Sequence, residues 1–245
     1  MDENKEAAPV AKRGFSVWLD NFWYHYKWQT IIAIFAIVIV TVCTLQMCDK
    51  ESYDSYILYA GDKEISRTGK DGDITTEYET FLASLSRIAP DRDGNGVKNV
   101  SLKDLFLLTS SQLEEAEKLE DKEVNYVLQN NNMEMFSTTI TYSDYFLCFL
   151  SKELYEENKT IDGISVFENL TSSVSGSSAV LYDDFALLLS STAFYSLPGI
   201  CELPEDTVVC VRAVSPLASQ FNGEKSQKHH DAAMEAFKNI VNYGN

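Results

Sequence analysis

The chain has 245 residues and a formal net charge of −17 at pH 7. Its composition, 45% hydrophobic and 23% charged, is typical of a folded globular protein and argues against a disordered chain. The excess of acid argues against nucleic acid and anionic membrane surfaces as partners of the folded part, because both carry negative charge.

An uncharged stretch runs from Trp28 to Cys48. As a helix it would reach about 30 Å, the thickness of the hydrocarbon core of a bilayer. We predict one transmembrane helix over residues 29–48. A bacterial lipoprotein signal ending at Cys48 and a buried core helix of a soluble protein remain open as alternatives. The predicted anchor residues include Ile31, Ile34, Phe35, Ile39 and Val42.

Residues 1–28 form a head without net charge, so the excess of acid follows the apolar stretch. Lys12, Arg13 and Lys27 precede the stretch, and Lys50 alone follows it closely. The positive-inside rule then predicts a cytoplasmic amino terminus, with the aromatic residues of the head in the headgroup layer. We therefore expect a single-pass protein of the cell membrane, embedded in the lipid bilayer. Its linker would cover residues 49–55 and its extracytoplasmic domain residues 56–245.

Beyond the linker, apolar runs typical of strands alternate with runs typical of helices. The predicted strands cover residues 56–61, 105–108, 145–150, 179–182 and 207–214. The predicted helices cover about 76–89, 111–119, 123–135, 152–158 and 185–195, and a last one begins near 230. This alternation predicts an α/β domain with a largely parallel sheet and flanking helices. A division into two small lobes is left open.

Asp91, Asp93 and Asn95 have the spacing of the first half of a calcium-binding loop, in which alternate oxygens surround the cation. The twelfth position of such a loop, which normally supplies a carboxylate, is Leu102 here. A tight turn explains the same residues, since Asp, Asn and Gly accept unusual backbone dihedrals. The turn is favoured, and the cation site stays open.

Other candidate groups are few. Asp183 and Asp184 follow a predicted strand and could act as acid and base in an anchored hydrolase, although a solvated turn is the simpler interpretation. His229 and His230 are expected to be solvated at a helix start rather than to hold a metal. The sequence contains no phosphate loop, dinucleotide fingerprint, nucleophile elbow or HExxH. We therefore predict no catalytic residue and no cofactor.

Five cysteines do not form a recognisable disulfide framework. Cys201 and Cys210 flank the segment ELPEDTVV and could face each other across a strand pair, so a disulfide between them is one interpretation. Cys148 lies in an apolar run and is expected to be buried.

Residues 131–161 contain a predicted helix, a turn, an apolar strand and then the residues SKELY. Together with the run Val208–Arg212 and the closing helix around Phe237, this order resembles the type II extracytoplasmic solute-binding proteins. The resemblance covers about half of the outer domain and includes no invariant motif. It implies a two-lobed α/β architecture, and no ligand residues are transferred from it.

From these features we expect a non-catalytic binding or interaction domain held at the membrane. Its partner would be a membrane protein or a small solute, and nucleic acid is not expected. An anchored hydrolase and a structural subunit of a membrane complex are the alternatives.

Overall fold

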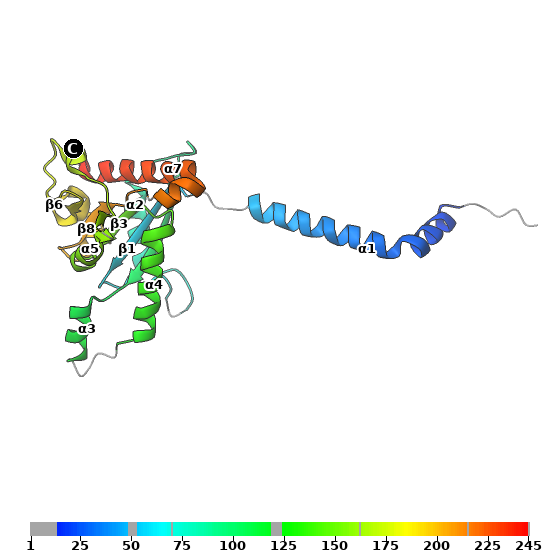
Figure 1. Ribbon diagram of the computed structural model, residues 1–245, viewed down its shortest axis with the longest axis horizontal. Helices are drawn as coiled ribbons and strands as arrows, with labels where there is room; N and C mark the ends of the chain where they lie inside the picture. Colours follow the sequence, from blue (N-terminus) through cyan, green and yellow to red (C-terminus); the bar gives the residue numbers. More distant parts are fainter. Residues whose placement is uncertain are drawn as a thin grey trace, which may run out of the picture. The chain divides into compact units, whose positions relative to one another are not determined.

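The structure is a computed structural model that describes residues 14–48, 53–69, 71–118, 124–161, 163–214 and 216–244. The chain forms two compact units, Met1–Glu51 and Ser52–Asn245. The first unit contains the long helix α1, and the second contains all the other helices and strands that Figure 1 shows.

Helix α1 spans Phe15–Cys48 without interruption. It therefore begins inside the predicted head, and the aromatic residues before Trp28 are helical as well. None of its most apolar segment, Trp18–Thr44, is buried. The predicted long apolar helix is thus confirmed, and its length and composition suit a membrane anchor or a signal sequence.

The second unit combines a six-stranded sheet, a small hairpin and helices of varied length. The strands are β1 (Ser55–Gly61), β2 (Val100–Phe106), β3 (Leu147–Leu150), β4 (Thr160–Ile161), β5 (Ile164–Ser165), β6 (Leu181–Asp183), β7 (Ala186–Leu188) and β8 (Val208–Val211). The α-helices are α2 (Thr76–Ser86), α3 (Ser110–Glu117), α4 (Tyr126–Tyr142), α5 (Lys152–Asn158), α6 (Thr171–Val174) and α7 (Pro216–Val241). Three 3₁₀ turns, η1 (Leu189–Ser191), η2 (Ala193–Ser196) and η3 (Ile200–Glu202), lie between β7 and β8.

The sheet has the strand order β2-β1-β3-β8-β7-β6. Strand β1 pairs in parallel with β2 and with β3, whereas β8, β7 and β6 continue the sheet by antiparallel pairing. The α/β class is confirmed, but the expectation of a largely parallel sheet is wrong, because the sheet is mixed. Strands covered on both faces are apolar in either direction, so their composition reports burial and not orientation.

Helices cover both faces of this sheet. Ile57 and Tyr59 of β1 belong to one buried cluster with side chains of α2 and α7. Leu58 and Ala60 point to the opposite face and pack with side chains of α4 and α5. One sheet thus organises the second unit, which is a single compact unit in its described residues and is not divided into two small lobes.

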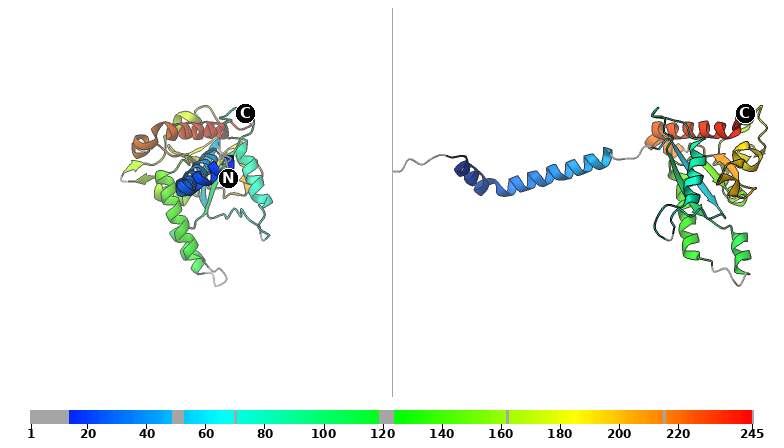
Figure 2. Two further views of the ribbon diagram at one scale, coloured as in Figure 1. Left: turned by 90° about the vertical axis from the view of Figure 1, so that its right-hand side faces the viewer. Right: turned by 180° about the vertical axis from the view of Figure 1, so that it is seen from behind.

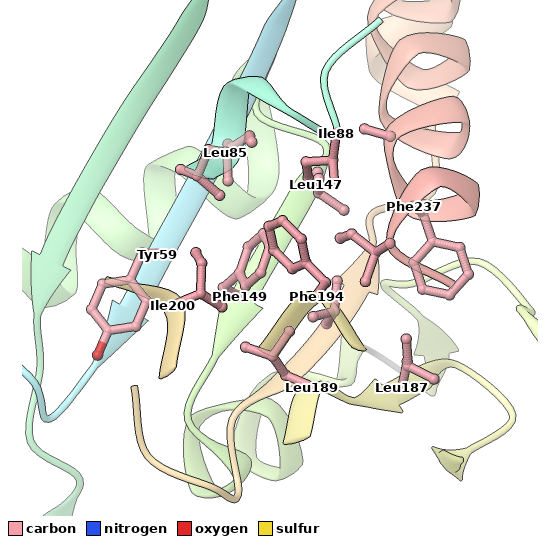
Figure 3. Close-up of a cluster of buried hydrophobic side chains, with 14 of the residues drawn as sticks. Tyr59, Leu85, Ile88, Leu147, Phe149, Leu187, Leu189, Phe194, Ile200 and Phe237 are labelled. Carbon is pink, nitrogen blue, oxygen red and sulfur yellow. The ribbon is translucent and has the colours of Figure 1, made fainter. Parts of the chain in front are cut away.

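The larger cluster gathers side chains from segments far apart in the sequence. Figure 3 shows Tyr59 of β1, Leu85 of α2, Phe149 of β3, Phe194 of η2 and Phe237 of α7 pointing into one core. Each of these residues is at most 2% exposed. The long segment between β7 and β8 therefore contributes to the core, although it contains only short 3₁₀ turns.

The predicted helix over residues 185–195 is wrong. Ala186, Leu187 and Leu188 instead form β7 and pair with β8, and the 3₁₀ turns follow. The local sequence is rich in Ala and Leu, which favour helices, but pairing with an apolar strand overrides that weak preference. The last helix also begins earlier than predicted, at Pro216, a residue favoured in the first turn of a helix.

Side chains cap the amino termini of α2 and α3. The side chain of Thr75 caps α2 by accepting a hydrogen bond from the Tyr78 amide. Thr109 and Gln112 form a complete capping box at the start of α3. Helix α5 has the predicted bounds, Lys152–Asn158.

Candidate functional site

The predicted anchor residues all lie exposed on α1. Ile31, Ile34, Phe35, Ile39 and Val42 are between 45% and 65% exposed, although they are among the most apolar side chains of the chain. Apolar side chains exposed around a whole helix are costly in water and favourable in lipid. This segment is the one element of the described chain with the length and composition of a membrane span.

A hollow of about 310 Å³ lies at the sheet edge formed by β6. It is lined by Lys159, Thr160, Ser165, Asp183, Asp184 and Phe185. The sequence-predicted acids therefore do line a surface depression. Their positions follow from the tight turn between β6 and β7, in which Asp184 and Phe185 are the two connecting residues.

The two acids of this hollow differ in their surroundings. Both carboxylate oxygens of Asp183 accept the Tyr155 hydroxyl, at 2.7 and 2.8 Å, and one also accepts the Phe185 amide at 2.9 Å. Lys159 lies 3.7 Å from the same carboxylate. Burial, and then the bond to Asp183, raise the pKa of Tyr155. Asp183 is thus held as a hydrogen-bond acceptor, while Asp184 is exposed.

The predicted cation residues are only partly brought together. Asp91 and Asp93 converge with a third carboxylate, that of Asp54, and the three ligand oxygens lie within 4.8 Å of one another. The Asn95 side chain instead donates to Asp93 at 2.6 Å and accepts the Val97 amide. Asp54 precedes β1 and was not found from the sequence, because nothing local links it to the loop that follows α2.

Backbone amides already occupy the oxygens of these carboxylates. Asp54, which is 3% exposed, accepts the amides of Arg92 and Asn99 at 2.9 and 2.8 Å. Asp91 accepts the amides of Gly94 and Gly96, both at positive φ. These bonds favour the interpretation as a tight turn, because they stabilise the loop without a cation.

A second hollow, of about 420 Å³, lies between α4 and Lys103 of β2. Its helical side consists of Asn131, Glu134, Met135, Thr138 and Thr139. Lys103 is held by Thr139, whose hydroxyl oxygen accepts from its ammonium group at 3.1 Å, and by the ring of Tyr145. Strand β2 is an edge strand with β1 as its only neighbour in the described sheet. This hollow was not predicted from the sequence.

The first half of α4 extends beyond the sheet together with α3, as Figure 1 and the right view of Figure 2 show. Only Gln129, Phe136, Thr139 and Ile140 of this helix are buried. Before its last two turns, the exposed apolar residues of α4 are Tyr126 (46%), Val127 (71%), Leu128 (43%), Met133 (37%) and Met135 (45%), here called the α4 apolar surface. Met135 belongs both to this surface and to the hollow beside β2.

The two adjacent histidines are not at a helix start, because α7 begins at Pro216. Their side chains are 10% and 12% exposed, so the expectation of solvated residues is wrong. The Nδ1 atom of His229 accepts from the Arg92 guanidinium at 3.3 Å, and the His229 ring lies edge-on to the Tyr56 ring. His230 lies 3.3 Å from the Glu168 carboxylate. The two rings contact different partners and do not form one site.

The structure does not pair Cys201 with Cys210, because Cys201 is exposed in η3 whereas Cys210 is buried in β8. The residue opposite Cys210 across the strand pair is Cys148, which is buried as predicted. The error arose because the segment before β8 forms a 3₁₀ turn and not a paired strand.

No family model matches this chain, and no curated protein or solved structure matches it either.

Proposed function

We propose that this protein is a single-pass membrane protein whose extracytoplasmic domain binds another protein and catalyses no reaction. In this proposal α1 is the anchor, the amino terminus is cytoplasmic, and residues 56–245 lie outside the cytoplasm. The exposed apolar side chains of α1 and the positive residues that precede the span support this topology.

The α4 apolar surface is the observation that carries the binding role. Val127 is 71% exposed, and its neighbours Tyr126 and Leu128 are both more than 40% exposed. Single exposed apolar residues are ordinary, but five of them distributed around one projecting helix are a candidate protein contact. Methionine side chains such as Met133 and Met135 adapt to partners of different shape.

The acids in the hollow at β6 favour this role over hydrolysis. Tyr155 and the Phe185 amide hold the Asp183 carboxylate as a hydrogen-bond acceptor within the domain, whereas a general base has to face the proton of its substrate. A small solute would be expected to bind in a more enclosed space than the two hollows offer. A protein partner that covers the α4 apolar surface is therefore the proposed ligand.

The test is photo-crosslinking of the full-length protein in its native membrane. A benzoylphenylalanine at position 127 is expected to give one covalent adduct of defined mass. The same group at Val180, which is 55% exposed and lies outside α4, is the matched control and is expected to give none. Met135→Glu, introduced into the protein labelled at position 127, is expected to abolish the adduct without changing the melting temperature, because Met135 is exposed.

Equal adducts from positions 127 and 180 would contradict the proposal, as would an adduct that Met135→Glu leaves unchanged. Hydrolysis of a generic ester or peptide substrate by the wild type, lost in Asp184→Asn, would favour the anchored hydrolase instead.

A further inference from the structure

Cys148 of β3 and Cys210 of β8 lie directly opposite each other in the antiparallel ladder, and neither side chain is exposed. We propose that these two cysteines form a cross-strand disulfide in the mature protein. The inference rests on the proposed extracytoplasmic location, because disulfides persist in oxidising compartments.

The backbone register sets the distance between the two residues. The Arg212 amide donates to the Phe146 carbonyl oxygen at 2.8 Å, which marks that opposed pair as a hydrogen-bonded one. Cys148 and Cys210 are two residues further along each strand and are therefore a pair of the same type. The Cα atoms of such a pair are about 5.5 Å apart, within the range that a disulfide bridges.

The two thiols also share one environment. Both belong to the cluster that packs beneath α4 and α5, so their side chains point to the same face of the sheet. The Cys148 thiol is 3.6 Å from the Phe146 carbonyl oxygen, and the Cys210 thiol is 3.8 Å from that of Cys148. Bonds of this length are weak, so neither sulfur has a strong partner to give up when the rotamers change.

The position of the pair indicates what the bond would do. The ladder between β3 and β8 joins the parallel half of the sheet, β2-β1-β3, to the antiparallel half, β8-β7-β6. The two cysteines are 62 residues apart in sequence. A covalent bond there closes a long loop and lowers the conformational entropy of the unfolded chain.

The oxidation balances with a disulfide as the oxidant. One cysteine thiolate attacks the oxidant's disulfide and releases one thiolate, and the second cysteine then displaces the other. Two protons leave the cysteines, two electrons pass to the oxidant, and the oxidant becomes a dithiol. Since both sulfurs are buried in the folded domain, the exchange takes place before β8 docks on β3.

The experiment uses the exposed Cys201 as an internal reporter of location. Intact cells that contain the full-length protein are treated with a membrane-impermeant maleimide. They are then denatured in excess iodoacetamide, and the unreduced digest is analysed by mass spectrometry. We expect Cys201 to carry the maleimide and the peptides of Cys148 and Cys210 to be linked. A reductant is expected to lower the melting temperature by about 5–15 °C, and this shift should vanish in Cys148→Ala/Cys210→Ala but persist in Cys201→Ala.

Alkylated Cys148 and Cys210 beside maleimide-labelled Cys201 would overturn the disulfide and leave the extracytoplasmic location standing. Alkylation of all three residues by iodoacetamide alone would overturn the location and the disulfide with it. A linkage of Cys210 to any other cysteine would also overturn the inference.

Discussion

The guanidinium of Arg212 donates a hydrogen bond of 2.7 Å to the carbonyl oxygen of Ile140. It also donates to the carbonyl oxygens of Thr139 and Ser143, and it lies 4.4 Å from the centre of the Phe146 ring. Arg212 follows β8 and is 4% exposed, so this buried cation closes the carboxyl end of α4. Cations are favourable there because the last carbonyl groups of a helix lack partners within it.

Replacement of this residue is expected to loosen α4. Arg212→Met should lower the free energy of unfolding by about 3 kcal/mol, because the carbonyl groups of Ile140 and Ser143 lose their charged donor. Arg212→Lys should recover part of this loss, since lysine keeps the charge but not the flat arrangement of donors. Thermal unfolding of the full-length protein in detergent, followed by near-ultraviolet circular dichroism, measures both effects. A melting temperature that Arg212→Met leaves unchanged would show that water or another group satisfies these carbonyls.

The carboxylate of Asp54 is expected to stabilise the loop around Asp91 by itself. Asp54→Ala should cost about 2–3 kcal/mol of unfolding free energy, because the amides of Arg92 and Asn99 lose a buried acceptor. Asp54→Asn keeps one carbonyl oxygen and should cost less. Chelation by EDTA should leave the wild-type melting temperature unchanged. Stabilisation of the wild type by millimolar Ca²⁺ that is absent in Asp54→Asn would instead establish the cation site.

The stability of the second unit is expected to fall as the pH decreases through the range in which His229 titrates. Burial lowers the pKa of His229 from 6.5, although the nearby Asp144 opposes this effect. The folded state then binds fewer protons than the unfolded state. The contribution of His229 to the free energy of unfolding is therefore complete above pH 6.5 and is lost as the pH falls below that value. Arg92 reinforces this direction, since it can donate to the ring nitrogen only while that nitrogen is unprotonated.

Melting temperatures measured at pH 7.5 and pH 5.5 test this expectation. The decrease should be smaller in His229→Gln, which has no titrating ring, than in the wild type. An equal decrease in both proteins would assign the pH dependence to other groups.

Charge introduced into α1 is expected to prevent anchoring. Ile34→Arg combined with Val38→Arg should cost about 2.5–3.5 kcal/mol of insertion free energy at each position if both lie near the middle of the span. The double variant should therefore leave the membrane pellet on alkaline carbonate extraction. Ile34→Leu with Val38→Leu is the matched control and should stay in the pellet. Wild-type protein that carbonate releases would show that α1 does not span the bilayer.

Some residues of the candidate sites could be predicted from the sequence, and others could not. Asp91 and Asp93 were predicted as neighbours because a spacing of two residues in one turn already brings them together. Asp54, which completes that cluster, is supplied by a distant segment. Asp183 was found from its place after a strand, but Tyr155, which fixes its role, lies on α5. Position in the chain carries no information about such long-range partners.

The sequence by itself determined the elements whose signals are local. Apolar residues on every face specified α1, and helical periodicity specified α2. Tertiary structure alone decided the direction of the strands, the extended form of residues 186–188 and the strand register that places Cys148 opposite Cys210. The physical reason is that local dihedral preferences amount to fractions of a kilocalorie per residue, whereas strand pairing and burial in a shared core depend on which distant segments meet.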